Sequence, residues 1–338
     1  MKKKITDEEI INRFLSVSTV YDLSLLLRIN YEDIWIAAEM PLYRSFFIPK
    51  KKGGFREIEA PHHQLKSIQK QLNFYLQKVY NSLLPESSHG FIVKSKGSEA
   101  KNIRSNASLH INKECVLNID LKDFFHSVSA SRIRYLFMSE PFNFERELAT
   151  CLALLCCFNK RLPMGAATSP VLSNFVCLDL DKRLKLLADN NKLNYSRFAD
   201  DISFSSDNTI SEKIITEIKI EISNHGFRIN TDKFRLQRNT NKQSVTGIKV
   251  NKKLNIERSY VRNLRAVLHD IEINGLHRAA KKYFKNNNLK DRWESTFYLS
   301  LKGKINFVGF VRGKDDDLYK KLKNKFVMLF DLEYIYKH

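Results

Sequence analysis

The order of the apolar patterns is the feature of this chain that most limits its fold. Helices are predicted where apolar residues recur at three- and four-residue spacing, over residues 65–83, 129–137, 145–157, 169–180 and 210–224. Strands are predicted for the apolar run 115–120 and on both sides of 199–201, where they would form a hairpin. Because strands and helices do not alternate as βαβ units, the pattern argues against a parallel sheet. The expected fold class is α+β.

Charge and pattern together predict three segments. Residues 1–40 are expected to form an N-terminal helical lead-in, 41–250 a mixed core, and 251–338 a basic helical domain. The chain has a formal net charge of +20, and residues 251–338 contain 20 basic and 10 acidic side chains. Such an excess favours a polyanionic partner, either nucleic acid or an anionic membrane surface.

Neither membrane insertion nor a structural zinc site is expected. The longest apolar run, residues 148–158, is too short to cross a bilayer. The five cysteines do not form the Cys-x-x-Cys pairs of zinc or redox sites, which favours buried free thiols in a reducing cytoplasm.

Three carboxylates occupy places where strands are predicted to end. Asp120 closes the run 115–120, while Asp200 and Asp201 lie at the tip of the predicted hairpin. Adjacent acids repel one another, and hard oxygen ligands suit Mg²⁺, so the three are candidates for a site that binds two metal ions. Taken alone, the Asp-Asp pair would more often be ordinary turn chemistry.

The surrounding motifs resemble the palm of reverse transcriptases in order and spacing. The three blocks are 118–125 (Asn-Ile-Asp-Leu-Lys-Asp-Phe-Phe), 162–170 (Leu-Pro-Met-Gly-Ala-Ala-Thr-Ser-Pro) and 198–201 (Phe-Ala-Asp-Asp). Phe198 replaces the tyrosine usual in the family, which removes a hydroxyl and keeps the ring. The resemblance covers roughly residues 45–310. Val-Thr-Gly at 245–247 and Asn-Ala-Ser-Leu-His at 106–110 match the pattern of bacterial retron reverse transcriptases.

This resemblance implies a right-hand polymerase with fingers, an antiparallel palm sheet and a helical thumb. Residues 41–250 would be the interleaved fingers and palm, and 251–338 the RNA-binding thumb. The catalytic and metal-binding residues would be Asp120, Asp200 and Asp201, which would hold two Mg²⁺ ions. The implied dNTP-binding residues are Lys51, Lys52, Arg56, Phe125, Met164, Gly165 and Lys233.

Particular roles are implied for some of these residues. The ring of Phe125 would collide with a ribose 2′-OH, although a plain core role is the alternative. Met164 stands where related enzymes often have glutamine, so its contact with the nucleotide would be apolar. Lys233 would act as a general acid toward pyrophosphate. The implied RNA-binding residues are Asn106, His110, Val245, Thr246, Gly247, Lys281, Lys282, Tyr283 and Arg292.

Retron relatives imply a specific product. The enzyme would copy a cognate structured noncoding RNA of the msr-msd type, primed from a 2′-OH of that RNA, into branched RNA-linked single-stranded DNA (msDNA). A separate effector protein would complete an antiphage defence system in the bacterial cytoplasm. The alternatives are another bacterial reverse transcriptase, such as a group II intron enzyme, and an RNA-binding scaffold that has the polymerase fold without its activity.

Overall fold

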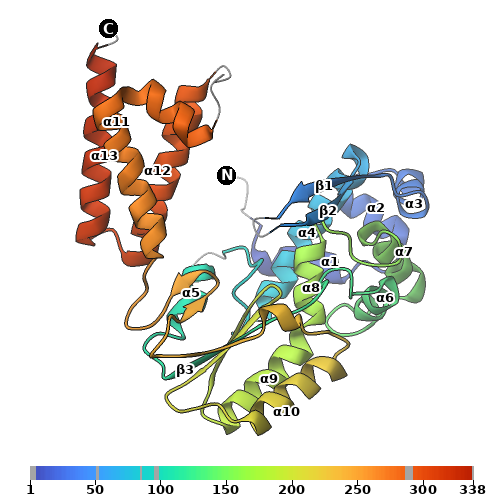
Figure 1. The fold of residues 1–338 in the computed structure, drawn as a ribbon. Helices are drawn as coiled ribbons and strands as arrows, with labels where there is room; N and C mark the ends of the chain where they lie inside the picture. The colour runs from blue at the N-terminus through green and yellow to red at the C-terminus, as the bar shows by residue number, and fades with distance from the viewer. Residues whose placement is uncertain (1–4, 51–52, 84–85, 95–98, 286–291, 337–338) are drawn as a thin grey trace.

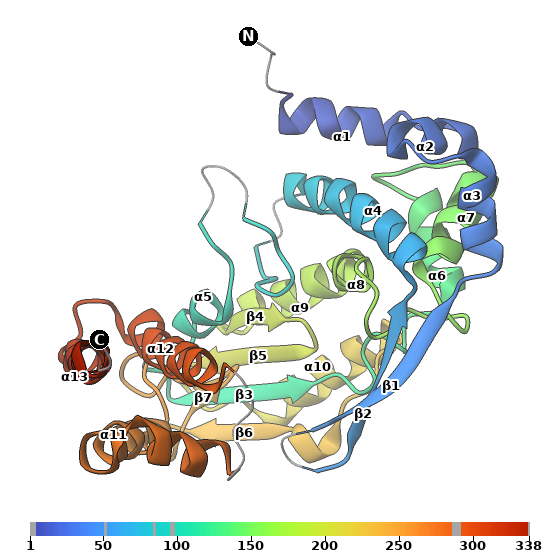
Figure 2. The same ribbon diagram turned by 90° about the horizontal axis from the view of Figure 1, so that it is seen from above.

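A four-stranded antiparallel sheet forms the centre of the molecule, with its strands in the order β4-β5-β3-β6 (Figures 1 and 2). The computed structural model describes residues 5–50, 53–83, 86–94, 99–285 and 292–336. The strands are β3 (Cys115–Asp120), β4 (Asn194–Phe198), β5 (Asp201–Ser206) and β6 (Arg235–Arg238). The predicted strand and hairpin are therefore confirmed. β6 was not predicted because its mostly exposed, polar sequence has no apolar pattern.

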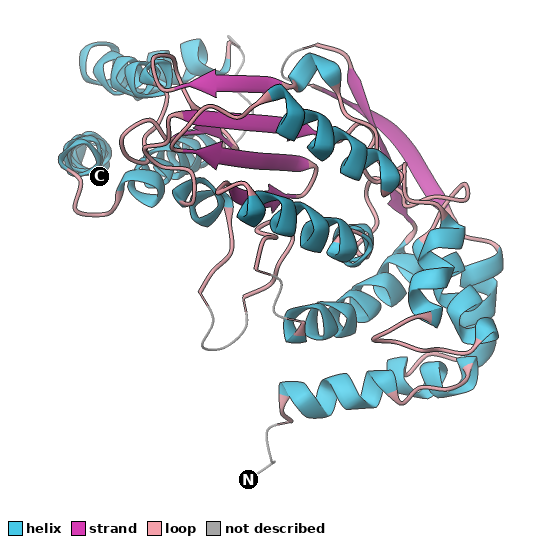
Figure 3. Ribbon diagram, turned by 90° about the horizontal axis from the view of Figure 1, so that it is seen from below, coloured by secondary structure: helices cyan, strands magenta, loops and turns pink. Residues whose placement is uncertain are grey.

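One face of this sheet is covered by α9 (Leu178–Asn190) and α10 (Glu212–Asn224), which lie side by side (Figures 1 and 3). Ser211 caps α10 by accepting a hydrogen bond from the Ile214 amide. The helix predicted from Ser169 is two helices, because α8 (Ser169–Val176) ends and α9 begins at Cys177. On the opposite face, His110 packs against Ser196 of β4 and Ser205 of β5, and Val116 of β3 joins a second hydrophobic core.

A group of helices and a long hairpin lie beyond one end of the sheet (Figure 2). The helices are α1 (Asp7–Leu15), α2 (Val20–Leu27), α3 (Tyr31–Glu39), α4 (His63–Ser82), α6 (Ala130–Met138) and α7 (Arg146–Cys156). The hairpin pairs β1 (Tyr43–Pro49) with β2 (Phe55–Pro61). Their apolar faces share one hydrophobic core with β3, β5, α8, α9 and α10. All five cysteines are buried free thiols, as predicted.

Three helices at the other end of the sheet form a separate bundle (Figure 1). They are α11 (Arg258–Phe284), α12 (Trp293–Arg312) and α13 (Asp317–Tyr336). A second hydrophobic core joins this bundle to α5 (Ile103–Ser108), β7 (Ser244–Val245) and β8 (Ile248–Lys249), and through Val116 to the sheet. Because this core includes residues before 251, it crosses the boundary expected there, and the three-segment division remains a prediction. None of the helices within the described ranges is both long and apolar enough to span a membrane.

The tip of the β4–β5 hairpin is packed from behind by residues 87–90. The Arg197 amide donates to the Ser87 carbonyl at 2.8 Å, and the His89 amide donates to the Arg197 carbonyl at 2.8 Å, so this segment runs along β4. A Cβ added to Gly90 would lie 2.6 Å from the backbone nitrogen of Ala199. The close packing behind this turn therefore requires a glycine at position 90.

Gly90→Ala should lower the free energy of unfolding by about 1–3 kcal/mol, because the new methyl group must displace backbone rather than a flexible side chain. Urea denaturation monitored by circular dichroism would measure the change. Gly303→Ala is the matched control: this glycine lies in α12 with no atom within 4 Å of the added Cβ, and alanine there should raise stability by about 1 kcal/mol. Equal stability of Gly90→Ala and the unmodified chain would contradict the packing described above.

Candidate active site

The register of the central sheet places two predicted site carboxylates side by side. Asp120, the last residue of β3, pairs directly with Asp201, the first residue of β5. Directly opposed residues project from the same face of an antiparallel pair, and like charges in that position repel. Asp200 occupies the two-residue turn between β4 and β5, next to this pair. The structure therefore brings all three predicted carboxylates to one end of the sheet.

Backbone hydrogen bonds hold the carboxylate-bearing segments together. The Leu121 amide donates to the Asp200 carbonyl at 2.9 Å, which ties the end of β3 to the hairpin tip. On the other side, the Asn230 amide donates to the Asp120 carbonyl at 2.8 Å. The backbone positions of Asp120 and Asp200 are therefore fixed by main-chain hydrogen bonds and do not depend on flexible side chains.

Asp120 also has two polar side-chain partners. Lys233 donates from Nζ to Asp120 Oδ1 at 2.6 Å, and Asn230 donates from Nδ2 to Oδ2 at 3.1 Å. Although partial burial opposes it, the hydrogen bond to Asp120 raises the pKa of Lys233 above its ordinary value. Lys233, expected at the nucleotide site, is therefore protonated and lies against a predicted metal ligand.

The other two carboxyl groups are short of compensating positive charge. Desolvation, followed by repulsion from Asp200 and Asp120, raises the pKa of Asp201 to about 7, even though Asp201 reaches solvent. Desolvation also raises the pKa of Asp200, and Asp120 adds to that rise. A cluster in this state favours binding of a cation.

The residues present fit a divalent cation. Within the described ranges no three His, Cys, Asp or Glu side chains are gathered closely enough to form a metal cage, and Asp120 is engaged by Lys233 instead. The aspartates nevertheless supply the hard oxygen donors that Mg²⁺ prefers. Desolvation and mutual repulsion raise the pKa values of Asp200 and Asp201, and a bound cation would offset both effects.

A cavity of about 270 Å³ opens beside these carboxylates. Its lining includes Asp120, Asp201, Lys233, Thr246 and Gly247. The turn between β7 and β8 therefore lies next to the carboxylates, although residues 201 and 246 are far apart in the sequence. A larger cavity of about 370 Å³ lies beside α3 and α4 and is lined by none of these five residues.

Two predicted dNTP-binding residues approach the same end of the sheet. Arg56 is exposed on β2, and its positive charge acts to lower the pKa of Asp200, so it lies within electrostatic reach of the carboxylates. Phe125 is half-buried, with its ring 5.5 Å from that of Phe124 and 5.9 Å from that of Phe91. Lys51 and Lys52 lie outside the described residues.

The loop that contains Met164 and Gly165 is fixed to β2 by Glu59. The Glu59 amide donates to the Met164 carbonyl at 2.9 Å, and a Cβ on Gly165 would lie 2.6 Å from the Glu59 carbonyl oxygen. The Glu59 carboxylate is buried and accepts two hydrogen bonds from Arg161 Nη1, at 2.9 and 3.1 Å. His126 Nε2 lies 3.3 Å from the same carboxylate. The long hairpin and the loop therefore form one unit.

Three of the residues expected to bind RNA are buried, and for these the expectation of direct contact is wrong. Asn106, His110 and Val245 each have 0% exposure. His110 is enclosed between two serines, 2.7 Å from Ser205 Oγ and 2.8 Å from Ser196 Oγ. Desolvation lowers its pKa to about 3, so the ring is neutral. These motif residues form the interior of the fold and do not present a surface to a ligand.

The remaining residues expected to bind RNA reach solvent to different degrees. Thr246 is half-exposed and Gly247 is exposed at the turn between β7 and β8. On the helical bundle, Lys282 and Arg292 are exposed and Lys281 is half-exposed. Tyr283 is half-buried, and its hydroxyl lies 2.7 Å from Ser300 Oγ, which gives it a packing role.

Sequence reasoning missed two residues that support this site. Glu59 lies in a strand where most neighbours are partly exposed, so nothing in the local pattern predicted its burial. Arg197 is a fully buried cation in β4. A charged residue within the predicted hairpin strand, three positions before Asp200, was the available signal.

Comparison with known proteins finds reverse transcriptases, in agreement with the sequence motifs. A family model described as reverse transcriptase (RNA-dependent DNA polymerase) matches residues 48–250. The Mx65 and Mx162 retron reverse transcriptases of Myxococcus xanthus are 35% and 31% identical to this chain over 67% and 68% of its length. The match spans about half of each of these relatives, 55% and 52%.

Two further matches cover a larger share of the protein with which this chain is compared. The Ec86 retron reverse transcriptase of Escherichia coli is 30% identical over 75% of this chain and 78% of its own length. A telomerase structure from Candida albicans, in complex with a fragment of telomeric RNA, superposes with a TM-score of 0.46 at 10% identity, over 95% of this chain and 72% of that one.

Glu59→Gln should lower the free energy of unfolding by about 1–2 kcal/mol. The amide keeps the volume and loses the charge that Arg161 pairs with, and the loss is moderate because Arg161 still reaches water. Thermal or urea unfolding would measure it. Glu57→Gln, the same substitution two residues earlier on β2, should leave stability almost unchanged. Identical unfolding midpoints for the two variants would show that Glu59 does not hold the hairpin to the loop.

Proposed function

Because the chain belongs to the reverse transcriptase family and is of the retron type, we propose that it is an RNA-directed DNA polymerase. The observation that carries this proposal is the direct pairing of Asp120 with Asp201, with Asp200 in the adjacent turn. Phosphoryl transfer needs groups that hold metal ions and cations that bind the phosphate oxygens. Here the aspartates lie within electrostatic reach of Arg56 on the β1–β2 hairpin.

In the proposed reaction, a primer hydroxyl attacks the α-phosphate of a dNTP, forms a phosphodiester bond and releases pyrophosphate. Two Mg²⁺ ions would be held by Asp120, Asp200 and Asp201. When bound, they would make deprotonation of the attacking hydroxyl easier and would neutralise negative charge on the departing pyrophosphate. Lys233, whose ammonium group donates a hydrogen bond to Asp120, would donate a proton to that leaving group.

The nucleotide would lie between the β1–β2 hairpin and the carboxylates. Arg56, together with Lys51 and Lys52, would bind the triphosphate oxygens. The loop containing Met164 and Gly165, fixed to β2 through Glu59, would pack against the new base pair. Phe125 would contact the sugar and exclude a ribose 2′-OH.

The proposed template is a cognate structured noncoding RNA. Priming from a 2′-OH of that RNA would give branched msDNA, and a separate effector protein would use the complex in antiphage defence in the bacterial cytoplasm. Retron homologues of known name support the RNA partner. The exposed cations Lys281, Lys282 and Arg292, with Thr246 and Gly247 nearer the carboxylates, would contact RNA phosphates and sugars.

The test is to express the chain together with several hundred flanking nucleotides of its native locus and to analyse the extracted nucleic acid. A short DNA that shifts on RNase and debranching treatment is the expected product. The double variant Asp200→Asn, Asp201→Asn should abolish it, because the neutral amides cannot balance a divalent cation.

Asp207→Asn is the matched control, since this aspartate is exposed and pairs with Lys113 away from the site. It should leave the product unchanged. Linear DNA alone would favour another kind of bacterial reverse transcriptase, such as a group II intron enzyme. DNA synthesis that persists in the double variant would overturn the metal assignment, and no DNA from the unmodified chain would favour the RNA-binding scaffold.

Phe125→Ala should raise incorporation of rNTPs relative to dNTPs, because removing the ring opens space for the 2′-OH. Primer extension with competing nucleotides measures the ratio of kcat/KM values, and a rise of about tenfold or more is expected. Phe74→Ala, which removes a partly exposed ring on α4, is the control for nonspecific loosening. Unchanged sugar discrimination in Phe125→Ala would leave that ring with a packing role alone.

A further inference from the structure

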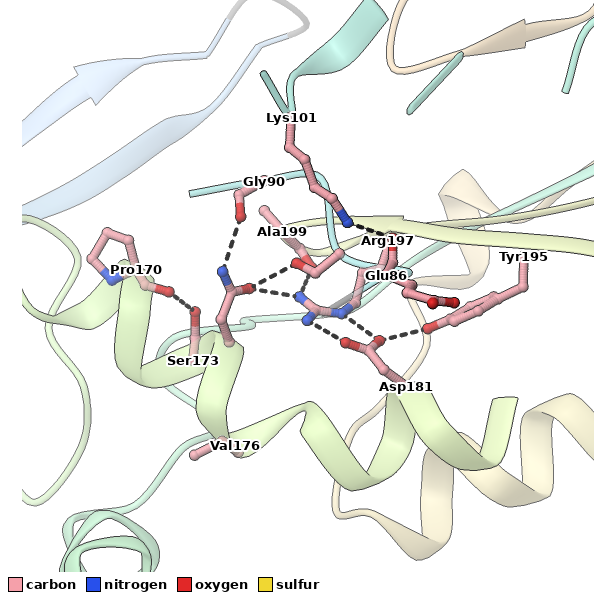
Figure 4. Close-up of polar contacts among 12 residues, drawn as sticks. Glu86, Gly90, Lys101, Pro170, Ser173, Val176, Asp181, Tyr195, Arg197 and Ala199 are labelled. Atoms are coloured by element: carbon pink, nitrogen blue, oxygen red, sulfur yellow. Dashed lines mark hydrogen bonds and ion pairs between the residues drawn. The ribbon is translucent and has the colours of Figure 1, made fainter. Parts of the chain in front are cut away.

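A buried ion pair lies directly behind the turn that carries Asp200. Arg197 on β4 has 0% exposure and is among the largest fully buried side chains of the described residues. Its Nε donates to Asp181 Oδ1 at 2.8 Å, and its Nη2 donates to Asp181 Oδ2 at 2.6 Å (Figure 4). Asp181 belongs to α9, so this two-bond contact fastens the strand to the helix beneath it.

The third guanidinium nitrogen reaches the turn itself. Arg197 Nη1 donates to the Ala199 carbonyl at 3.1 Å and to Asn174 Oδ1 at 3.0 Å. Asn174 Nδ2 in turn donates to the Gly90 carbonyl at 2.9 Å. The carbonyl of the residue immediately before Asp200 is therefore held by a cation that α8, α9 and the 87–90 segment keep in place (Figure 4).

Ala199 needs such an external restraint. Its φ is +58°, a left-handed conformation that costs a non-glycine residue about 1–2 kcal/mol. Phe198 pairs with Asp201, which leaves Ala199 and Asp200 as a two-residue loop whose geometry sets where both aspartates point. Without a partner for the Ala199 carbonyl, the turn could relax to a commoner conformation and move the carboxylates apart.

Stability alone is a weak reason for this arrangement. Burying an Arg-Asp pair removes two charges from water, and well-packed apolar residues of similar volume often stabilise a core as well. Tyr195 adds a hydrogen bond to Asp181 Oδ1 at 2.6 Å, but its hydroxyl makes no contact with the turn in the described structure. The contact specific to Arg197 is the one with Ala199.

We propose that Arg197, balanced by Asp181 and braced by Asn174, is a positioning residue that fixes the Ala199–Asp200 turn and so holds the Asp200 and Asp201 carboxylates at the spacing needed to bind divalent cations. This inference rests on the proposed polymerase function. It assigns part of the metal affinity to a guanidinium that touches neither metal nor substrate.

The experiment compares two full-length variants. Tyr195→Phe, the control, removes one hydrogen bond to Asp181 and leaves the turn contacts intact. The triple variant Tyr195→Phe, Asp181→Leu, Arg197→Met replaces the ion pair with apolar side chains of similar volume. Its free energy of unfolding is expected to be close to that of the control. Mn²⁺ binding to the RNA-free protein, measured by electron paramagnetic resonance, should be about 10–100-fold weaker in the triple variant.

Two further readouts separate positioning from general loosening. Amide hydrogen exchange should accelerate at residues 199–202 in the metal-free triple variant, while α9 and α10 exchange as in the control. Raising Mn²⁺ to saturation should restore much of the primer-extension kcat, with the KM for dNTP unchanged.

Equal Mn²⁺ affinity and equal exchange in the control and the triple variant would overturn the proposal. If the triple variant does not fold, Asn174→Ala serves instead: it keeps the ion pair, removes the brace to Gly90, and should weaken Mn²⁺ binding in the same direction, whereas unchanged binding would again overturn the proposal. A control protein that binds Mn²⁺ but extends no primer would mean that the proposed function fails while the positioning role stands.

Discussion

The gathering of three aspartates at one end of the central sheet is the constraint on which the rest of the structure depends. Asp120 and Asp201 are directly paired across two strands, and Asp200 follows in the connecting turn. Nothing in the intrinsic preference of a β-hairpin favours this arrangement, because like charges in opposed positions repel. The surrounding fold supplies the compensation through backbone hydrogen bonds to Leu121 and Asn230, and through the ammonium group of Lys233.

The need to hold these aspartates in place explains why polar side chains lie in the interior of the fold. His110 bridges Ser196 of β4 and Ser205 of β5 on the face of the sheet opposite α9, and desolvation keeps its ring neutral. The polar side chains at this position therefore satisfy one another's hydrogen bonds. Glu59 plays a comparable part at the opposite side of the site, where it joins the β1–β2 hairpin to the loop at Met164. Motif residues in this chain therefore divide into those that face the open end of the sheet and those that hold its shape.

Much of the fold could be predicted because its signals are local. The helix over 65–83, the strand over 115–120 and the hairpin around 199–201 each have a periodicity of their own and are confirmed by α4, β3, β4 and β5. β6 could not be predicted, since its four residues become a strand only by pairing with β3. The break between α8 and α9 at Cys177 is likewise absent from an apolar pattern that continues through it.

The sequence by itself determined the identity and order of the carboxylates, the family motifs around them and the basic C-terminal region, because these are properties of composition and spacing. Only the tertiary structure decided that Asp120 lies opposite Asp201, that Asn106 and His110 are interior, and that Arg197 reaches the carbonyl of Ala199. Register and burial arise from contacts between residues as far apart in the chain as Gly90, Asn174 and Arg197. No local pattern contains such contacts, because their free energy exists only once the separate elements have packed together.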